Sequence, residues 1–373
     1  MKKLFQFFDS GETKLIDLPS PIPKRGEVLI ATKCSLVSSG TEKTLIDFGK
    51  ANLIEKAKQQ PDKLAEAISK FKTDGLMNTV EAIRSKLDQP IPLGYCNAGV
   101  VKAIGDEVKN FKVGDRVASN GPHAELVTVP ENLCAHIPDN VSFEEASFTI
   151  VSSIGLQGVR LLNPTIGETY VVSGLGLIGL ITCQILLANG CIVLGLDPNK
   201  KRCDLAESLG VKSLCLSDGV DPVQWCVNET KGIGVDGFLI TASTASNDPI
   251  VVAAKSCRKR GRIILIGVTG LQLRRDLFYE KELTFQVSCS YGPGRYDKQY
   301  EEDNIDYPIG FVRWTEQRNF QSILKLIETK SLNVKKLISH QFVFDNSLDA
   351  YELLLSREES LGIVLNYSEL VDI

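Results

Sequence analysis

A glycine-rich turn between a β-branched run and an apolar, helix-length segment constrains the fold of this chain most strongly. Residues 169–197 read TYVVSGLGLIGLITCQILLANGCIVLGLD. This stretch predicts a strand, the turn GLGLIG at 174–179, a helix, and a second strand that ends at Asp197. Because all four parts fall at the expected spacing, they predict a dinucleotide-binding β-α-β unit rather than an isolated glycine turn.

The three glycines of this turn and the acid after it each have a physical role. Gly174 permits the tight turn, Gly176 lets the backbone approach a pyrophosphate, and Gly179 lets the helix pack against the strand. Asp197 can accept hydrogen bonds from both ribose hydroxyls of NAD, and its charge would repel the 2′-phosphate of NADP. We therefore expect NAD, with NADP the less favoured cofactor. The predicted contacts in the turn are Gly174, Leu175, Gly176, Leu177, Ile178 and Gly179.

Helices and strands continue to alternate after Asp197. Periodicity predicts helices over about 199–209, 221–230 and 246–261, and strands over 211–217, 235–243, 262–270 and 282–290. With the two strands of the first unit, this makes six strands separated by helices. That count is typical of a doubly wound α/β domain, which we place at 150–290.

The regions on either side of 150–290 have a different pattern. Short β runs punctuated by Gly and Pro precede residue 140 and predict a small, irregular β domain. After residue 290 we expect two helices and a last strand, GIVLNY, that rejoins this domain. The predicted β domain therefore combines 1–149 and 291–373.

Residues 45–90 are charged and have helical periodicity, which predicts two or three amphipathic helices inserted into the β domain. Two roles remain open for this insertion: a packing appendage, or a lid or subunit contact.

Composition excludes several classes of protein. The chain of 373 residues is 43% hydrophobic and 24% charged, as expected of a soluble globular protein. Its formal net charge of −4 argues against a nucleic-acid partner, and the N-terminal region lacks an apolar run long enough to span a membrane. Ten cysteines without a CxxC pair favour free thiols in a reducing cytoplasm.

Motifs in the N-terminal half carry a resemblance to a known family. They are GYCNAGVVKAIGDEVKNFKVGDRV at 94–117, AELVTVPEN at 124–132 and IPDNVSFEEAS at 137–147, and they precede the dinucleotide unit in that order. The chain resembles the medium-chain dehydrogenase/reductase superfamily, the relatives of zinc alcohol dehydrogenases. The resemblance implies a GroES-like β domain joined to a Rossmann domain with a doubly wound, parallel six-stranded sheet.

The chain departs from the family at the catalytic zinc. By position, the zinc ligands are replaced by Ser38, Tyr95, Cys96 and Thr149. Hydroxyls and a phenol are poor zinc ligands beside thiolate and imidazole, so we predict no zinc. A rearranged site built from Cys34, Cys96 and His123 is the alternative. Without a metal, Ser38, Thr149 and His123 are expected near the substrate.

Other phrases are similar to a zinc-less branch of the superfamily. They are VSSGTEK at 37–43, LGYCNAGVV at 93–101 and SYGPGRYD at 290–297. The branch includes the N-terminal module of two-part oxidoreductases from bacterial surface-polysaccharide gene clusters. This resemblance implies chemistry on a sugar, a polyol or a nucleotide sugar.

Oxidising a secondary alcohol without zinc requires a side chain that takes the hydroxyl proton. Lys43 occupies the position of the proton-relay histidine of zinc members, and Tyr95 occupies a lost ligand position. A positive nicotinamide ring nearby would lower the pKa of either group. Glu42 is adjacent to Lys43 and could pair with it.

The resemblance also assigns residues outside these motifs. It implies Arg202 near the adenosine ribose and the turn that starts with Gly267 and Val268 near the nicotinamide, and we group Thr241 with these cofactor residues. The aromatic and arginine-rich block at 291–318 predicts substrate contacts, because aromatic faces stack on rings and guanidinium groups bind phosphate or carboxylate. The predicted contacts in this block are Arg295, Arg313 and Trp314.

Taken together, these features predict a cytoplasmic, NAD-dependent and zinc-independent oxidoreductase that acts on a small polyhydroxylated substrate, as a homodimer. Two alternatives remain open. One is a zinc-less quinone or enone reductase, although such reductases usually prefer NADPH. The other is a non-catalytic NAD-binding scaffold protein.

Overall fold

The protein forms two compact units, which are described separately. The computed structural model describes residues 1–7, 10–50, 90–356 and 358–368. One unit comprises Met1–Val129 with Ile338–Ile373, and the other comprises Pro130–Leu337.

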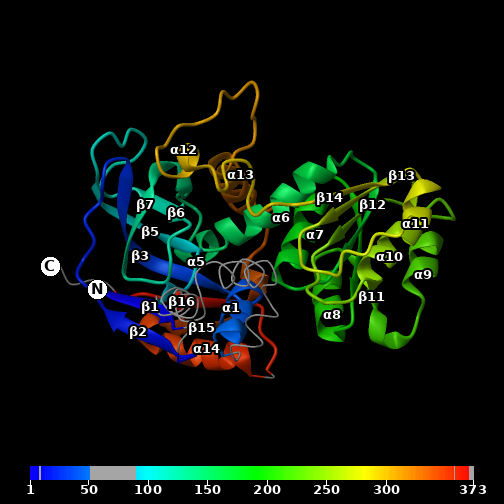
Figure 1. Cartoon of the computed structure of the whole chain (residues 1–373), viewed down its shortest axis with the longest axis horizontal. Coiled ribbons are helices and arrows are strands. Elements are labelled where there is room, and N and C mark those ends of the chain that lie inside the picture. The colour runs from blue at the N-terminus through cyan, green and yellow to red at the C-terminus, as the bar shows by residue number, and fades with distance from the viewer. Residues whose placement is uncertain (8–9, 51–89, 357, 369–373) are drawn as a thin grey trace, which may run out of the picture. The chain divides into compact units, whose positions relative to one another are not determined.

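A six-stranded sheet forms the centre of the Pro130–Leu337 unit (Figure 1). Its strands are β9 (Thr169–Ser173), β10 (Ile192–Asp197), β11 (Lys212–Cys215), β12 (Val235–Ile240), β13 (Cys257–Leu265) and β14 (Thr284–Val287). All neighbouring strands are parallel, in the order β11-β10-β9-β12-β13-β14. The predicted doubly wound α/β fold is therefore confirmed. The chain reverses direction across the sheet between β9 and β12, the switch point at which such sheets bind dinucleotides.

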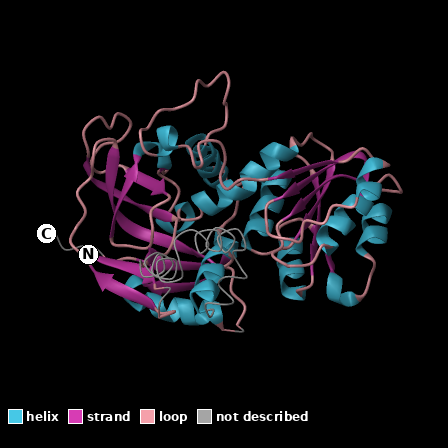
Figure 2. Ribbon diagram, viewed as in Figure 1, coloured by secondary structure: helices cyan, strands magenta, loops and turns pink. Residues whose placement is uncertain are grey.

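Helices cover both faces of this sheet (Figure 2). The helices of this unit are α5 (Phe143–Ala146), α6 (Thr149–Leu162), α7 (Leu177–Ala188), α8 (Lys200–Ser208), α9 (Pro222–Glu229), α10 (Asp248–Ser256), α11 (Arg275–Tyr279), α12 (Lys298–Glu301) and α13 (Glu316–Glu328). Local sequence fixes several of their starts. The Asn199 side chain accepts the backbone N–H groups of Lys201 and Arg202 at the start of α8. Asp221 caps α9, which begins with proline.

The helix predicted over 246–261 is shorter than expected, since α10 ends at Ser256 and β13 begins at Cys257. Lys281 explains the difference. Its ammonium donates hydrogen bonds to the carbonyls of Ala254, Lys255 and Cys257, at 3.0, 2.6 and 2.7 Å. These bonds satisfy the carbonyls that a helix end leaves free, so the chain can turn into a strand at this point.

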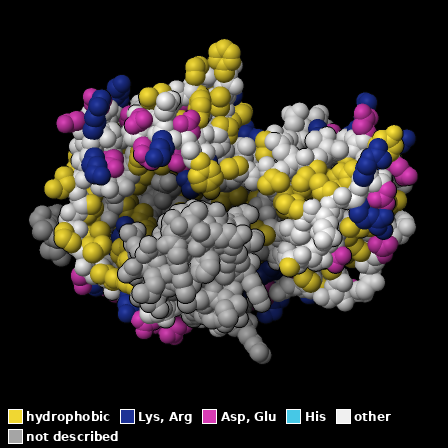
Figure 3. All heavy atoms as spheres, in the orientation of Figure 1, with side chains coloured by type: hydrophobic (Ala, Val, Ile, Leu, Met, Phe, Trp, Pro, Cys, Tyr) yellow, Lys and Arg dark blue, Asp and Glu magenta, His cyan; other side chains and the backbone are white. Residues whose placement is uncertain are grey.

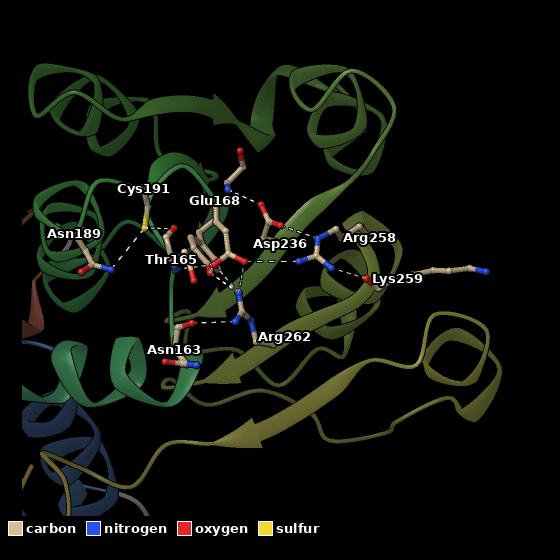
Figure 4. Close-up of polar contacts among 11 residues, drawn as sticks. Asn163, Thr165, Glu168, Asn189, Cys191, Asp236, Arg258, Lys259 and Arg262 are labelled. Carbon is tan, nitrogen blue, oxygen red and sulfur yellow. Dashed lines mark hydrogen bonds and ion pairs between the residues drawn. The ribbon is translucent and has the colours of Figure 1, made fainter. Parts of the chain in front are cut away.

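A polar network lies where β9, β12 and β13 begin (Figure 4). Arg262 Nη2 donates to both oxygens of Glu168 at 2.8 and 2.7 Å, and Arg258 Nε donates to Asp236 Oδ1 at 2.7 Å. The other Asp236 oxygen accepts the Thr169 backbone N–H at 2.7 Å. Because these charges pair with one another, the network holds the amino ends of the strands together.

In the part of the chain that the structure describes, the other unit contains two sheets. Its strands are β1 (Lys2–Gln6), β2 (Thr13–Asp17), β3 (Glu27–Ser38), β4 (Ile91–Pro92), β5 (Asn97–Ile104), β6 (Arg116–Ser119), β7 (Leu126–Pro130), β15 (Ile338–Val343) and β16 (Gly362–Asn366). One sheet has the order β2-β1-β4, and the other contains β15-β16-β3-β5-β6 with β7 paired to β3. The last strand, β16, runs antiparallel to β3, so it rejoins the N-terminal strands as predicted. Among the described residues of this unit, the α-helices are α1 (Thr41–Lys50) and α14 (Ser347–Leu355).

The compact units are bounded differently from the predicted domains. Residues 130–149 and 291–337 group with the six-stranded sheet. Helix α13 packs against α6 in this unit, and Arg160 of α6 donates hydrogen bonds to Asn319 and Ser322 of α13. Of the predicted helical insertion, the end of α1 is described, and residues 51–89 lie outside the described part of the chain.

One face of the molecule carries charged side chains of both signs (Figure 3). On the face shown in Figure 3, Lys and Arg side chains lie among Asp and Glu side chains instead of forming one basic patch. Within the described residues, no helix is long and apolar enough to cross a membrane.

Candidate active site

The glycine turn after β9 has the geometry that a dinucleotide site requires. Gly174 has a φ of +99°, and a Cβ there would lie 2.6 Å from the backbone nitrogen of Ala242. A Cβ at Gly179 would lie 1.9 Å from the Gly174 carbonyl oxygen. In contrast, the nearest atom to a Cβ at Gly176 is an Arg202 nitrogen 4.0 Å away. Two glycines are therefore needed for packing, and the space beside Gly176, at the start of α7, is open to a ligand.

Asp197 lies at the carboxyl end of β10 and is 3% exposed. Its Oδ2 accepts the backbone N–H of Leu175 at 2.7 Å, and its Oδ1 accepts that of Asn199 at 2.8 Å. Arg202 Nη1 lies 3.9 Å from Oδ2. The carboxylate thus ties the glycine turn to the end of the neighbouring strand, and each oxygen keeps acceptor capacity for another donor.

The remaining predicted cofactor residues lie at the same edge of the sheet. Thr241 Oγ1 donates to the Gly174 carbonyl at 2.6 Å, which joins the end of β12 to the turn. A Cβ at Gly267 would lie 2.1 Å from the Ala242 carbonyl oxygen. The next residue, Val268, is 68% exposed. The structure therefore brings the segments after β9, β10, β12 and β13 together, where residues so far apart in sequence could bind one cofactor.

The predicted catalytic residues lie in the other unit, and two of the lost ligand positions meet there. The Tyr95 hydroxyl donates to Ser38 Oγ at 2.7 Å. Ser38 is buried at the end of β3, and its backbone N–H donates to Glu42 Oε1 at 2.8 Å. Tyr95 is half-buried and Lys43 is exposed. Of the three predicted catalytic groups, Tyr95 and Glu42 are therefore linked through Ser38.

Glu42 is 1% exposed, and its second oxygen contacts two aromatic side chains. The Tyr351 hydroxyl donates to Oε2 in a short hydrogen bond, and His123 Nε2 lies 3.3 Å from the same oxygen without the alignment of a hydrogen bond. No ion pair joins Glu42 to the exposed Lys43 among the described residues, so the pairing suggested by their adjacency does not form.

His123, which was expected near the substrate, does not reach solvent. Its side chain is fully buried, and Nδ1 shares a 2.7 Å hydrogen bond with Ser35 Oγ. Ser35 Oγ also lies 2.9 Å from the Tyr367 hydroxyl. The position depends on Gly94, because a Cβ at this glycine would lie 2.5 Å from the imidazole. The imidazole is therefore part of the packed interior, and the expected contact between His123 and substrate stays a prediction that this burial does not support.

Burial and charge keep the phenols of this network protonated. Burial first, and then the charge of Glu42, raises the pKa of Tyr351 well above its usual value. Burial likewise raises the pKa of Tyr367. Both phenols therefore remain hydrogen-bond donors or neutral partners across the physiological range.

The donor set does not suit zinc. Ser38 Oγ accepts a hydrogen bond from Tyr95, and Thr149 Oγ1 donates to the Ala146 carbonyl at 2.7 Å. Cys34 Sγ, from the alternative site, lies 3.2 Å from Asn366 Oδ1. Among the residues that the structure describes, no three His, Cys, Asp or Glu side chains are placed to share a metal ion. Hydroxyl oxygens engaged in this way are weak zinc ligands.

The arginines of the block at 291–318 differ in whether they pair with a carboxylate. Arg295 pairs with Glu301, and Arg318 pairs with Asp306. Arg313 is exposed and stacks on Trp314, with its Cζ 3.9 Å from the ring centroid. Arg295 is therefore neutralised within the protein, whereas the exposed Arg313 is available to a ligand.

Sequence reasoning missed several members of these sites. Tyr351, Tyr367 and Ser35 were not singled out, because nothing in the local pattern links them to Glu42 or His123. Arg160 was also missed, since a single arginine before the glycine turn carries no signal.

Comparisons with known proteins agree with this architecture. The family model "Alcohol dehydrogenase GroES-like domain" matches residues 66–139, and "Zinc-binding dehydrogenase" matches residues 178–304. D-guloside 3-dehydrogenase of Escherichia coli (strain K12) is 29% identical over 270 residues, covering 69% of this chain and 72% of that protein. L-idonate 5-dehydrogenase of Vitis vinifera is 27% identical over 327 residues, covering 74% and 80%.

The fold is also similar to solved structures. One is a short chain alcohol dehydrogenase from Escherichia coli CFT073 complexed with NADH. It has a TM-score of 0.73 and 20% identity, and the match covers 98% of this chain and 99% of that one. At this identity the likeness shows a shared fold.

Proposed function

The chain belongs to the zinc-type alcohol dehydrogenase family of the medium-chain dehydrogenase/reductase superfamily, and from this membership we propose an NAD-dependent oxidoreductase that works without zinc. It transfers hydride between nicotinamide and a secondary alcohol or ketone of a sugar, a polyol or a nucleotide sugar. A role in surface-polysaccharide synthesis, a cytoplasmic location and a homodimer belong to the same proposal. The polyhydroxylated substrate is supported by relatives named for a guloside and for idonate.

The position of Asp197 carries the proposed preference for NAD. The carboxylate is fixed by two backbone N–H groups at the end of β10, beside the open space at Gly176. A fixed negative charge there favours ribose hydroxyls and disfavours a 2′-phosphate. Bound NAD would supply the hydride acceptor. The residues that would hold this cofactor are the glycine turn, Asp197, Thr241 and the segment at Gly267. The same preference argues against an NADPH-dependent enone reductase.

We assign the proton transfer to Tyr95 in preference to Lys43. The Tyr95 phenol is held by Ser38, and Ser38 is in turn held by buried Glu42. Glu42 contacts Ser38 through a backbone N–H, which does not carry a proton onward. In this proposal Glu42 is therefore a positioning residue, and the phenol is the group that exchanges a proton with substrate.

Turnover of a polyol panel by the purified full chain tests the function. We expect NADH formation with at least one polyol, no stoichiometric zinc by elemental analysis, and activity that is unchanged by a chelator. About one zinc per chain, together with activity lost on chelation, would contradict zinc independence. Cofactor binding without turnover of any panel member would favour the scaffold alternative.

Two variants test the site. Tyr95→Phe should lower kcat by roughly 10²–10⁴-fold while NADH binding survives, because the ring remains and only the phenol is lost. Lys43→Ala, one residue from Glu42, should keep kcat. If Lys43→Ala is inactive and Tyr95→Phe is normal, the lysine is the base. Near-normal kcat in both variants would show that neither residue transfers the proton.

A further inference from the structure

Trp314 lies between two guanidinium groups. Arg160 Cζ lies 3.5 Å from the indole centroid, and Arg313 Cζ lies 3.9 Å from the same centroid. One face of the ring has no room for two guanidinium groups so close to its centre, so the arginines occupy opposite faces. Each stack is a favourable cation–π contact. Together they place two positive charges within a few ångströms of one aromatic ring.

Arg160 is held in this position by neutral groups. Its Nε donates to Asn319 Oδ1 at 2.7 Å, and its Nη2 donates to Ser322 Oγ at 3.1 Å, which ties α6 to α13 (Figure 1). Nη1 has no hydrogen-bond partner among the described residues, and it is not enclosed. The fork of Arg160 is therefore fixed by two of its nitrogens, and the third remains available to an external acceptor.

Neither arginine has an acidic partner in the described chain, although neighbouring arginines do. Arg295 and Arg318 of the same block each pair with a carboxylate, Glu301 and Asp306. Burial first, and then the charge of Arg313, lowers the pKa of Arg160 to about 10. Two cations are thus held near each other at an electrostatic cost, and no carboxylate in the described part of the chain pairs with either of them.

We propose that Arg160, Trp314 and Arg313 form a binding site for an oxyanion of the substrate, a phosphoryl group or a carboxylate. The anion supplies the missing countercharge and accepts from Arg160 Nη1 and from the Arg313 fork. The indole between them sets the spacing of the two guanidinium groups. This inference deepens the proposed function and rests on it, because it assigns the charged end of the polyhydroxylated substrate to this site.

Direct binding of inorganic phosphate to the full chain tests the site without any turnover. Calorimetric titrations should be made with and without NADH, since bound NADH occupies the glycine turn. Arg313→Gln should weaken phosphate binding roughly tenfold or more in both titrations, because it removes a charge-assisted contact. Arg274→Gln is the matched control, an exposed arginine already paired with Asp276, and should bind phosphate like wild type. Equal phosphate affinity in wild type and Arg313→Gln overturns the proposal.

Kinetics with three related substrates then identify the anion. The probes are an uncharged hexitol, its monophosphate and the matching hexonic acid. A rise in KM on Arg313→Gln that is confined to the monophosphate assigns a phosphoryl group, and a rise confined to the acid assigns a carboxylate. An equal rise for the uncharged hexitol overturns the proposal. Absence of turnover with all three would contradict the proposed function and leave the phosphate titration as the separate measure of the site.

Discussion

Glu42 and Asp197 are both buried carboxylates, one in each compact unit, but their surroundings prepare them for different tasks. Each accepts the backbone N–H of a residue that helps to form a candidate site, Ser38 for Glu42 and Leu175 for Asp197. Among the described residues, Asp197 accepts hydrogen bonds from backbone N–H groups and has one arginine nitrogen 3.9 Å away. The second Glu42 oxygen is enclosed by Tyr351 and His123.

The difference shows that a buried carboxylate can either bind a ligand or stabilise the folded chain. A carboxylate has about four acceptor positions, and Asp197 uses two of them on the chain itself. The rest can face a ribose at the edge of the sheet. Glu42 faces protein on all sides, and its contacts bind α1, β3 and α14 into one cluster. We therefore expect loss of Glu42 to affect folding, and loss of Asp197 to affect cofactor choice.

The largest expected effect is on folding and follows from removing Glu42. Glu42→Leu leaves the Ser38 N–H and the Tyr351 hydroxyl without an acceptor, beside a buried imidazole. Breaking a buried polar cluster in this way costs about 3–5 kcal/mol of unfolding free energy. Urea unfolding followed by circular dichroism measures it. Glu42→Gln keeps an acceptor and the shape, so it should lose less.

A matched surface control separates this effect from the loss of any acidic residue. Glu282 is exposed and pairs with Arg260, so Glu282→Leu should leave the unfolding free energy unchanged. If Glu42→Leu is as stable as Glu282→Leu, the Glu42 cluster contributes nothing to folding, and the contrast with Asp197 fails.

How well each acid could be predicted depends on how far away its partners lie in the sequence. Asp197 follows Leu175 by 22 residues, inside one β-α-β unit whose spacing is fixed by helix and strand geometry. Glu42 meets Tyr351 across 309 residues, and His123 meets Ser35 across 88. No local period encodes such contacts, so Glu42 was noticed only as a neighbour of Lys43.

The same reasoning explains which parts of the fold were predictable. The parallel sheet followed from apolar runs alternating with helical periodicity, and the structure confirms it. The early end of α10 was missed because it depends on Lys281, more than twenty residues away. Arg160 was missed for a similar reason, since its significance comes from Arg313 and Trp314 of a different segment.

A third buried carboxyl, Glu316, sharpens the comparison because neither of its oxygens has a hydrogen-bond partner among the residues that the structure describes. Burial first, and then the negative charge of Glu301, raises the pKa of Glu316 to about 9. The folded protein therefore keeps this proton above the pH at which the unfolded chain, with a carboxyl pKa near 4.5, releases it. Stability should fall as pH rises between these two values, by at most about 1.4 kcal/mol per pH unit.

Glu316→Gln tests this assignment, since an amide is neutral at every pH. The variant should lose the fall in stability between pH 6 and pH 8 that we expect of wild type, with little change at pH 4. Thermal unfolding at the three pH values measures it. An identical pH dependence in wild type and variant would show that Glu316 ionises normally in the folded protein.

The smallest expected effect is on cofactor choice, at Asp197. Wild type should bind NADH more tightly than NADPH, and Asp197→Ser should narrow or reverse the preference by about 1.5–3 kcal/mol. The change removes the repulsion of a 2′-phosphate and releases Arg202, 3.9 Å away, to pair with that phosphate.

Arg202→Ala in the Asp197→Ser background should then remove the gained NADPH affinity. Asp197→Asn keeps the size and one acceptor oxygen, so its effect should be intermediate. Fluorescence titration of both cofactors measures each preference, and equal wild-type affinities would show that Asp197 serves the glycine turn alone, as Glu42 serves its cluster.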